Sequence, residues 1–374
     1  ARLERNHARR GWPGNPQITI EETRMNYQII DHPGAWRASE NSRDTFTVTL
    51  GDPQLQALDQ ALQTAKQRCA DAEDMTQDDF PLGAISADVS AWREQVMDGY
   101  GIIILSGFPL EKYSKEELGM IHFGLGTYFG TAMSQSVMGD RLGHVVNVGG
   151  KDPKERAYRN STELDMHTDA CDVVAMMCLQ PAIEGGFSGY VSAIAIYNEV
   201  LRRRADLMPI LVRGFCYHRF GEEEPGQGPV TEDRIPVFSF EQGLLSVNYL
   251  RSYIEMAAEE LGEPLTSDEV AALDLVDDIA HDERFALKFL TNPGEAVFFN
   301  NLTVLHNRTA FEDASEEPLK RHFLRLWLVA HEPRPVAETL RIYEGQGIQK
   351  QEGKSTYFEG DLEYSRFEDD DGRM

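Results

Sequence analysis

Short apolar runs separated by turn residues fill the chain from about residue 144 onward, and this pattern constrains the fold more than any other feature. Many short strands with turn signals between them are typical of a β-sandwich or barrel. Segments with helical spacing interrupt them at 194–203, 249–261 and 267–280. The sequence therefore predicts a mainly β fold, a jelly roll with helical insertions, with strands at 144–148, 173–179, 189–193, 212–218, 235–238, 244–247, 285–290, 296–299, 303–305 and 323–329.

The first hundred residues differ from this pattern. Residues 1–50 are polar and rich in turn residues, whereas 54–70 and 86–98 have helical spacing. We expect one domain over 1–374. It would consist of an N-terminal arm and helices packing on the core (1–100), the jelly-roll core (101–335) and a C-terminal extension (336–374) that ends in an acidic, solvated run.

The amino-acid composition limits the classes of partner that this chain is expected to bind. The 374 residues include 36 Lys and Arg against 62 Asp and Glu, a net charge of −26 that argues against nucleic acid or an anionic membrane surface. No apolar run is long enough to cross a membrane. The four cysteines have no CxxC spacing, which favours free thiols and a cytoplasmic location. We expect a small-molecule partner, and a homo-oligomer stays open.

Metal chemistry is indicated by His167 and Asp169 together with a distant histidine, His306. In extended backbone, residues i and i+2 point to the same side, so the His-x-Asp pair can bind one metal ion. His306 follows a short apolar run near the C-terminal end of the predicted core. Two histidines and one carboxylate on one side of a metal leave open positions, as in non-haem Fe(II) oxygenases.

The last predicted strand carries Arg321, Phe323, Arg325 and Trp327 at a spacing of two, so these side chains share one face. If that face points inward, the two buried guanidinium groups require anionic partners. A bound carboxylate would match the planar fork of arginine. If the face points outward, the arginines would pair with the acidic surface. The residues alone leave both arrangements open.

The order of His-x-Asp, distal His and then Arg resembles the Fe(II)/2-oxoglutarate-dependent dioxygenases of the taurine dioxygenase group, which includes clavaminate synthase-like enzymes. The resemblance covers about residues 100–335 and implies a double-stranded β-helix core. It is carried by the segments ELDMHTDACDVV, EGGFSGYVSA, GEAVFFNNLTVLHNRTAFED and KRHFLRLWL.

This resemblance implies roles for individual residues. His167, Asp169 and His306 would bind Fe(II). Arg321 would hold the distal carboxylate of 2-oxoglutarate, and Ser188 stands where the family has an assisting hydroxyl, often a threonine. Arg325 matches a second arginine that the family often uses near the 1-carboxylate or the primary substrate. Further candidate substrate contacts are Arg325, Asn147, Gln135 and Arg308.

The resemblance also implies the reaction. With Fe(II), 2-oxoglutarate and O2, the enzyme would hydroxylate, desaturate or cyclise a small polar molecule bearing a carboxylate or an amine, with release of succinate and CO2. Related halogenases lack the carboxylate ligand, so Asp169 disfavours halogenation. Two other functions stay open: a zinc-dependent hydrolase or isomerase using the same three ligands, and a non-catalytic jelly-roll binding protein.

Overall fold

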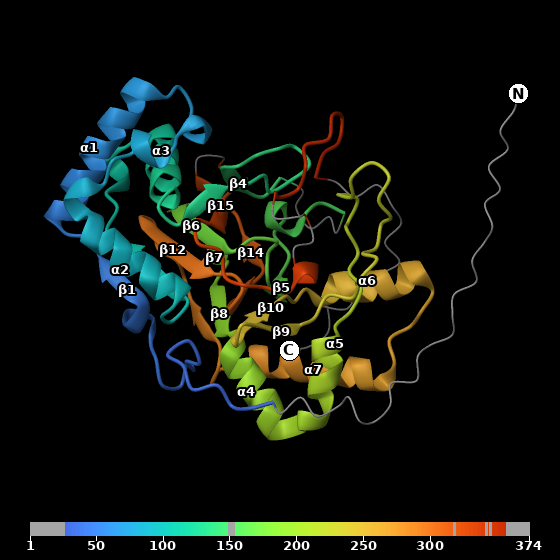
Figure 1. Cartoon of the computed structure of the whole chain (residues 1–374). Helices are drawn as coiled ribbons and strands as arrows, with labels where there is room; N and C mark the ends of the chain where they lie inside the picture. The colour runs from blue at the N-terminus through green and yellow to red at the C-terminus, as the bar shows by residue number, and fades with distance from the viewer. Residues whose placement is uncertain (1–26, 149–153, 317–318, 341–342, 344–345, 357–374) are drawn as a thin grey trace, which may run out of the picture.

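Two β-sheets face each other at the centre of the computed structural model (Figure 1). The structure describes residues 27–148, 154–316, 319–340, 343 and 346–356. The start of the predicted N-terminal arm and the acidic C-terminal run lie outside these residues. Among the described residues, no helix is both long and apolar enough to cross a membrane.

The larger sheet is seven-stranded, and the smaller opposite sheet has four strands. The larger sheet has the neighbour order β1 (Thr47–Thr49), β2 (Ile102–Ser106), β12 (Glu295–Asn300), β6 (Val173–Gln180), β15 (His322–Ala330) and β3 (Gly130–Ala132), with β4 (Gly143–Val145) also paired to β15. The smaller sheet has the order β11 (Leu287–Phe289), β8 (Ser188–Ser192), β13 (Val304–Arg308) and β5 (Leu164–His167). Two short ladders complete the pairing, β9 (Phe238–Glu241) with β10 (Leu244–Val247) and β7 (Glu184–Gly185) with β14 (Phe311–Glu312).

Apolar side chains from both sheets fill the space between them. Val297 and Phe299 of β12 point inward from the larger sheet and pack in the same cluster as Tyr190 and Val304 of the smaller one. Because side chains alternate along a strand, the intervening residues of β12 face the other way. The larger sheet is therefore apolar on both faces and has to be covered on its outside.

A layer of three helices covers that outer face, as the blue and cyan ribbons in Figure 1 show. Ile103, Phe298 and Leu326 of the sheet pack in one cluster with α1 (Asp52–Arg68), α2 (Ser86–Met97) and α3 (Lys115–Gly126). Helix α3 begins with a capping box, in which Ser114 Oγ accepts from the Glu117 amide and Glu117 Oε2 accepts from the Ser114 amide.

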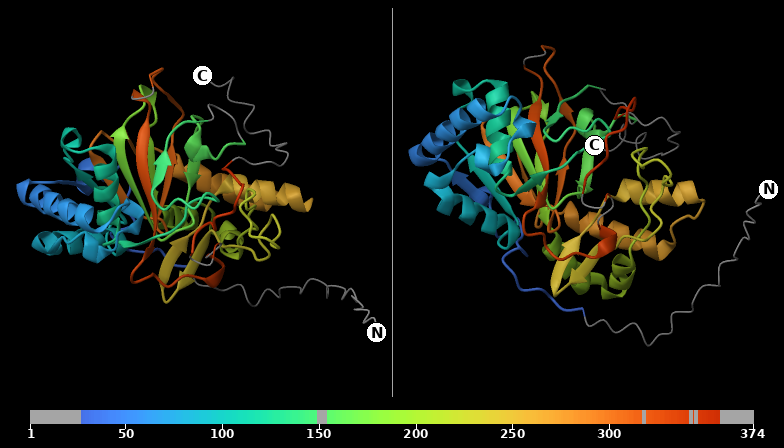
Figure 2. Two further views of the ribbon diagram at one scale, coloured as in Figure 1. Left: turned by 90° about the horizontal axis from the view of Figure 1, so that it is seen from above. Right: turned by 45° about the horizontal axis from the view of Figure 1, so that its top comes forward.

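The long segment between β8 and β11 forms a second helical layer, seen at the side of the smaller sheet in Figure 2. This layer packs against the smaller sheet through Val191 and Leu305. It contains α4 (Ala193–Arg204), α5 (Met208–Arg213), α6 (Arg251–Leu261) and α7 (Ser267–Ala280) together with β9 and β10. Short 3-10 helices lie at η1 (Arg43–Phe46), η2 (Ala72–Asp74), η3 (Gln77–Asp79), η4 (Gly83–Ile85), η5 (Leu110–Lys112), η6 (Ala157–Arg159), η7 (Ala205–Leu207) and η9 (Glu338–Leu340).

Two sequence predictions need correction. The fold is mixed rather than mainly β, with 34% helix and 23% strand, because helices cover the outer side of both sheets. The strand predicted at 212–218 is wrong. Helix α5 runs to Arg213 and ends at Gly214, after which only the isolated bridges Phe215–Ile235 and His218–Val230 form. The division of the chain at residues 100 and 335 stays a prediction.

Candidate active site

Strand pairing brings the predicted metal ligands together. In the antiparallel pair of β13 and β5, His306 lies directly opposite His167, and the centroids of the two rings are 4.1 Å apart. Asp169 follows two residues after the end of β5. One potential ligand atom from each of the three residues lies within 4.8 Å of the others. The smaller sheet thus gathers two nitrogen donors and one carboxylate at one point.

Two residues to which the sequence had assigned no role hold Asp169 in place, one through its backbone and the other through its carboxylate. Asn301 accepts a hydrogen bond from the Asp169 amide (2.8 Å), and its Nδ2 donates to the carbonyl oxygens of Asp169 (2.5 Å) and Cys171 (2.8 Å). Trp327 Nε1 donates to Asp169 Oδ2 at 2.8 Å. In the sequence, Trp327 was placed on the same strand face as the two arginines, and nothing indicated a role for Asn301.

The protonation states suit metal binding. His167 Nδ1 lies 2.8 Å from the carbonyl oxygen of Asp165 and donates to it in the neutral imidazole, which leaves Nε2 free to bind a metal. Burial lowers the pKa of His306 to about 3, with a further contribution from His167, and burial also lowers the pKa of His167.

Although burial acts in the opposite direction, the positive charge of Arg325, the two histidines and the Trp327 hydrogen bond keep the pKa of Asp169 below its usual value. Two neutral imidazoles and one carboxylate are a donor set that fits Fe(II). His306 Nε2 lies 3.7 Å from Asp169 Oδ2, and His167 Nε2 lies 3.7 Å from Asp169 Oδ1. Asp165 does not contribute a fourth ligand, because its side chain is exposed to solvent.

Arg321 points inward and is only 3% exposed, which decides between the two arrangements left open by the sequence. Its guanidinium carbon lies 4.1 Å from the ring centroid of Phe323 and 5.1 Å from that of Phe311. Burial lowers the pKa of Arg321 to about 10, and its Nη1 has no hydrogen-bond partner. Among the described residues, no carboxylate lies within 4.0 Å of this guanidinium, and the nearby Asp313 acts to raise its pKa without forming an ion pair with it.

Ser188 is the first residue of β8, and its hydroxyl lies 3.3 Å from that of Thr291, which is 2% exposed. Gly185 and Gly186 precede it with φ of 70° and 68°, a conformation that favours glycine. A Cβ on Gly185 would lie 2.2 Å from the Ala310 carbonyl oxygen, so the close approach of β7 to β14 requires glycine.

Arg325 also points inward and lies next to the metal ligands. Its Nη1 is 3.9 Å from Asp169 Oδ2, and its guanidinium carbon is 4.5 Å from the ring centroid of Tyr158. Its Nε donates to Gln135 Oε1 at 2.7 Å, while Gln135 Nε2 donates to the carbonyl oxygens of Arg325 (2.9 Å) and Arg141 (2.8 Å). The side-chain amide of Gln135, predicted as a substrate contact, is thus used to orient Arg325.

The two other predicted substrate contacts, Arg308 and Asn147, do not line the cavities next to Asp169 and Arg325. Arg308 is 6% exposed, and its Nη2 donates to the carbonyl oxygens of Ala157 (3.4 Å) and Thr162. Burial, reinforced by the charge of Arg321, lowers the pKa of Arg308 to about 9. Asn147 is half-buried just after β4 and does not line either of the two cavities beside the metal ligands.

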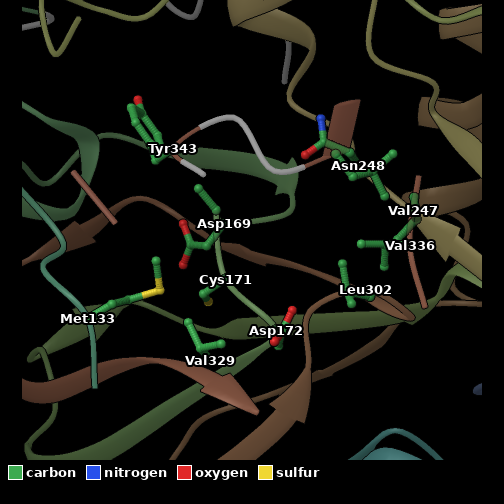
Figure 3. Close-up of a pocket in the computed structure, with 12 residues that line it drawn as sticks. Met133, Asp169, Cys171, Asp172, Val247, Asn248, Leu302, Val329, Val336 and Tyr343 are labelled. Carbon is green, nitrogen blue, oxygen red and sulfur yellow. The ribbon is translucent and has the colours of Figure 1, made fainter. Parts of the chain in front are cut away.

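One of these cavities adjoins Asp169, and Figure 3 shows Met133 and Tyr343 on either side of this carboxylate with Asn248 farther along the wall. The other cavity has a volume of about 190 Å³ and lies next to Arg325. Its polar lining includes Gln135, Asp140, Tyr158 and Arg159. A small molecule could therefore reach the neighbourhood of the metal ligands from the side of Arg325.

Near the first cavity, a charged network links four separate chain segments. Arg156 Nε lies 3.0 Å from Glu222 Oε1, and Arg156 Nη1 donates to the Tyr253 hydroxyl at 2.5 Å. The Tyr343 hydroxyl donates to Glu222 Oε2 at 3.3 Å. Burial raises the pKa of Glu222, which is 4% exposed, while Arg156 and Arg325 act to lower it. The sequence offered no motif that marked these residues.

Comparison with known proteins identifies relatives of this chain. FR-33289 synthase from Streptomyces rubellomurinus is 27% identical over 313 residues, which cover 82% of this chain and 92% of that protein. The taurine hydroxylase-like protein SAT17 from Stachybotrys chartarum is 26% identical over 307 residues, covering 78% and 77%.

Solved structures share the fold. An asparagine oxygenase in complex with Fe(II), 3-hydroxyasparagine and succinate matches with a TM-score of 0.61 and 16% identity, covering 82% of this chain and all of that one. The non-haem iron oxygenase OrfP with Fe and α-ketoglutaric acid matches with a TM-score of 0.56 and 11% identity, covering 76% and 94%.

The family assignment follows from a match over most of the chain. The model of the family described as "Taurine catabolism dioxygenase TauD, TfdA family" matches residues 63–327. This range contains the three gathered ligands and both inward-pointing arginines. The chain belongs to this family of Fe(II)- and 2-oxoglutarate-dependent oxygenases, which have a double-stranded β-helix core and act on small molecules.

Proposed function

We propose that this enzyme hydroxylates, desaturates or cyclises a small polar molecule bearing a carboxylate or an amine, and that His167, Asp169 and His306 bind its Fe(II). The observation that carries this proposal is the convergence of three ligand atoms within 4.8 Å, in a fold whose buried Arg321 forms no ion pair among the described residues. Membership of the dioxygenase family sets aside the zinc hydrolase or isomerase and the non-catalytic binding protein.

In this proposal Arg321 and Ser188 bind the distal carboxylate of 2-oxoglutarate. A buried guanidinium costs several kcal/mol unless an anion compensates it, so Arg321 favours a ligand carboxylate. The Ser188 hydroxyl, at the start of β8, would donate a hydrogen bond to the same carboxylate. When bound, iron and 2-oxoglutarate supply the oxidation of a C–H bond, coupled to decarboxylation to succinate.

The substrate would bind beside Arg325, in the space next to Asp169. The 190 Å³ cavity corresponds to roughly six water molecules, which suits a small ligand. Arg325 offers a cation at one wall of this cavity, and Tyr158 covers its guanidinium. Tyr343, which lines the other cavity with Asp169, donates a hydrogen bond to Glu222.

A substrate that bears charge fits this environment better than an apolar one. Burying the Arg156–Glu222 pair has a desolvation cost that is hard to justify by stability alone, because well-packed apolar residues are often equally stable. Tyr343 lines the cavity beside Asp169 and connects Glu222 to it, so in this proposal the charged pair acts on a polar ligand through Tyr343. Two of the proteins with a similar fold, the asparagine oxygenase and an OrfP variant, were solved in complex with 3-hydroxyasparagine and with 3-hydroxyarginine, which supports amino acids as the first compounds to test.

Anaerobic binding of Fe(II) and 2-oxoglutarate tests the ligand assignment. We expect the wild-type protein to develop a visible charge-transfer absorption band, and His167→Ala and Asp169→Ala to lose it. Asp165→Ala is the matched control, because this carboxylate is exposed on the same strand while its backbone carbonyl stays in place. Retention of the band at full strength in both ligand variants would refute the assignment.

Succinate release from a panel of amino acids, other polar acids and amines, and apolar compounds tests the substrate class. We expect turnover with charged polar compounds, and we expect Glu222→Gln to raise KM for the hit at least about tenfold. The same variant should keep the anaerobic 2-oxoglutarate band, since Glu222 lies outside the proposed co-substrate site. A substrate without carboxylate or amine, or a KM unchanged by Glu222→Gln, would contradict this part of the proposal.

A further inference from the structure

Arg308 is a buried cation with no carboxylate in direct contact among the described residues, although the charges of Asp313 and Glu163 act on it from farther away. Its side chain is 6% exposed, and among the described residues it forms no ion pair within 4.0 Å. Its Nη2 is used by the carbonyl oxygens of Ala157 and Thr162, whereas its Nε has no hydrogen-bond partner. These backbone contacts offset only part of the cost of removing a charged guanidinium from water.

The strand register places Arg308 on the side of the sheet that carries the metal ligands. In the pairing of β13 with β8, His306 lies opposite Tyr190 and Arg308 lies opposite Ser188. Side chains directly opposite each other, and those two apart on one strand, project to the same face. His306, Arg308 and Ser188 therefore belong to one inward-facing surface, with Arg308 at the end nearer Ser188.

Arg308 also shares an aromatic contact with Arg321. The ring centroid of Phe311 lies 4.7 Å from the Arg308 guanidinium carbon and 5.1 Å from that of Arg321. Two like charges at this range repel each other in a poorly solvated pocket. Asp313 is oriented toward the backbone, where its Oδ1 accepts from the Arg321 amide at 2.7 Å, and it forms no ion pair with either guanidinium.

We propose that Arg308 is a second cation of the 2-oxoglutarate site, acting with Arg321 on the distal carboxylate. This inference rests on the proposed function, since it takes Arg321 and Ser188 as the site of that carboxylate. A bound carboxylate would relieve the repulsion between the two guanidinium groups. The backbone contacts of Arg308 keep it in place and fix the 157–162 segment, which carries Tyr158 to Arg325.

Anaerobic titration of the Fe(II)-loaded protein separates a charge effect from a structural one. The ligands are 2-oxoglutarate and 2-oxobutyrate, which lacks the distal carboxylate, and the readout is the dissociation constant from the absorption band. We expect Arg308→Gln, which can still donate to the carbonyl oxygens, to weaken 2-oxoglutarate binding about tenfold or more. Arg308→Lys, which keeps the charge, should change it by less than about threefold. Neither variant should alter the binding of 2-oxobutyrate.

Arg334→Gln is the matched control, because this arginine also donates to a backbone carbonyl, that of Leu245, and has an unpartnered Nε. It should bind both ligands like the wild type. The proposal is overturned if Arg308→Gln weakens both ligands equally, leaves both unchanged, or is matched by Arg308→Lys. A wild-type protein that forms no band with 2-oxoglutarate would instead refute the proposed function.

Discussion

Replacing Trp327 with phenylalanine should weaken Fe(II) binding without dismantling the site. Trp327 is 3% exposed and donates its indole N–H to Asp169 Oδ2 at 2.8 Å. A hydrogen bond to a charged group contributes about 1.5–3 kcal/mol. Loss of a partner that orients a metal ligand typically costs about 10–100-fold in metal affinity, which at about 1.4 kcal/mol per tenfold is the same range. Phenylalanine keeps an aromatic ring beside Arg325, whose guanidinium carbon lies 4.9 Å from the indole ring.

The assay is an anaerobic Fe(II) titration with saturating 2-oxoglutarate, followed through the absorption band. Trp92→Phe is the matched control, because this tryptophan is also buried (5% exposed) but packs among the helices outside the larger sheet. Both variants should lose some stability from the smaller ring. An Fe(II) dissociation constant for Trp327→Phe within about twofold of the Trp92→Phe value would show that the indole N–H does not orient Asp169.

Three further predictions concern one residue that supports Asp169 and two buried positions on α3. Asn301→Ala should lower thermal stability and Fe(II) affinity together, since it frees the backbone around Asp169; unchanged affinity in a folded variant would contradict this. Gly124→Ala should destabilise the protein by about 1–3 kcal/mol in chemical denaturation, because its Cβ would lie 2.3 Å from the Phe80 ring; wild-type stability would refute it. Burial lowers the pKa of His122 to about 4, so the native state resists protonation and loses stability as pH falls from about 6.5 toward 4. His122→Leu should make the loss of stability over this pH range smaller. An unchanged dependence of stability on pH would show that the buried imidazole does not cause it.

Local patterns in the sequence predicted much of the site. His167 and Asp169 are close in sequence, so their convergence needs only extended backbone. The spacing of Arg321, Arg325 and Trp327 placed them on one face of a strand for the same reason. The capping box before α3 was likewise readable, because its two hydrogen bonds join residues three apart.

The remaining features depend on which strands pair, and no local pattern encodes this. Whether the arginine face points inward was decided only when β15 was placed beside β6 with helices covering its other side. The hydrogen bonds that orient the site join residues separated by 132 positions for Asn301 and Asp169, 158 for Trp327 and Asp169, and 190 for Gln135 and Arg325.

The sequence by itself predicted the kind of chemistry, because residue type and spacing indicated three metal donors and the family resemblance implied that Arg321 binds a carboxylate. The tertiary structure decided the supporting contacts and the walls of the substrate space. Glu222 and Tyr343 show no distinctive pattern along the chain, and their environments, like that of Arg308, arise from the packing of distant segments. The charge of a buried group depends on what surrounds it, and only the folded chain specifies those surroundings.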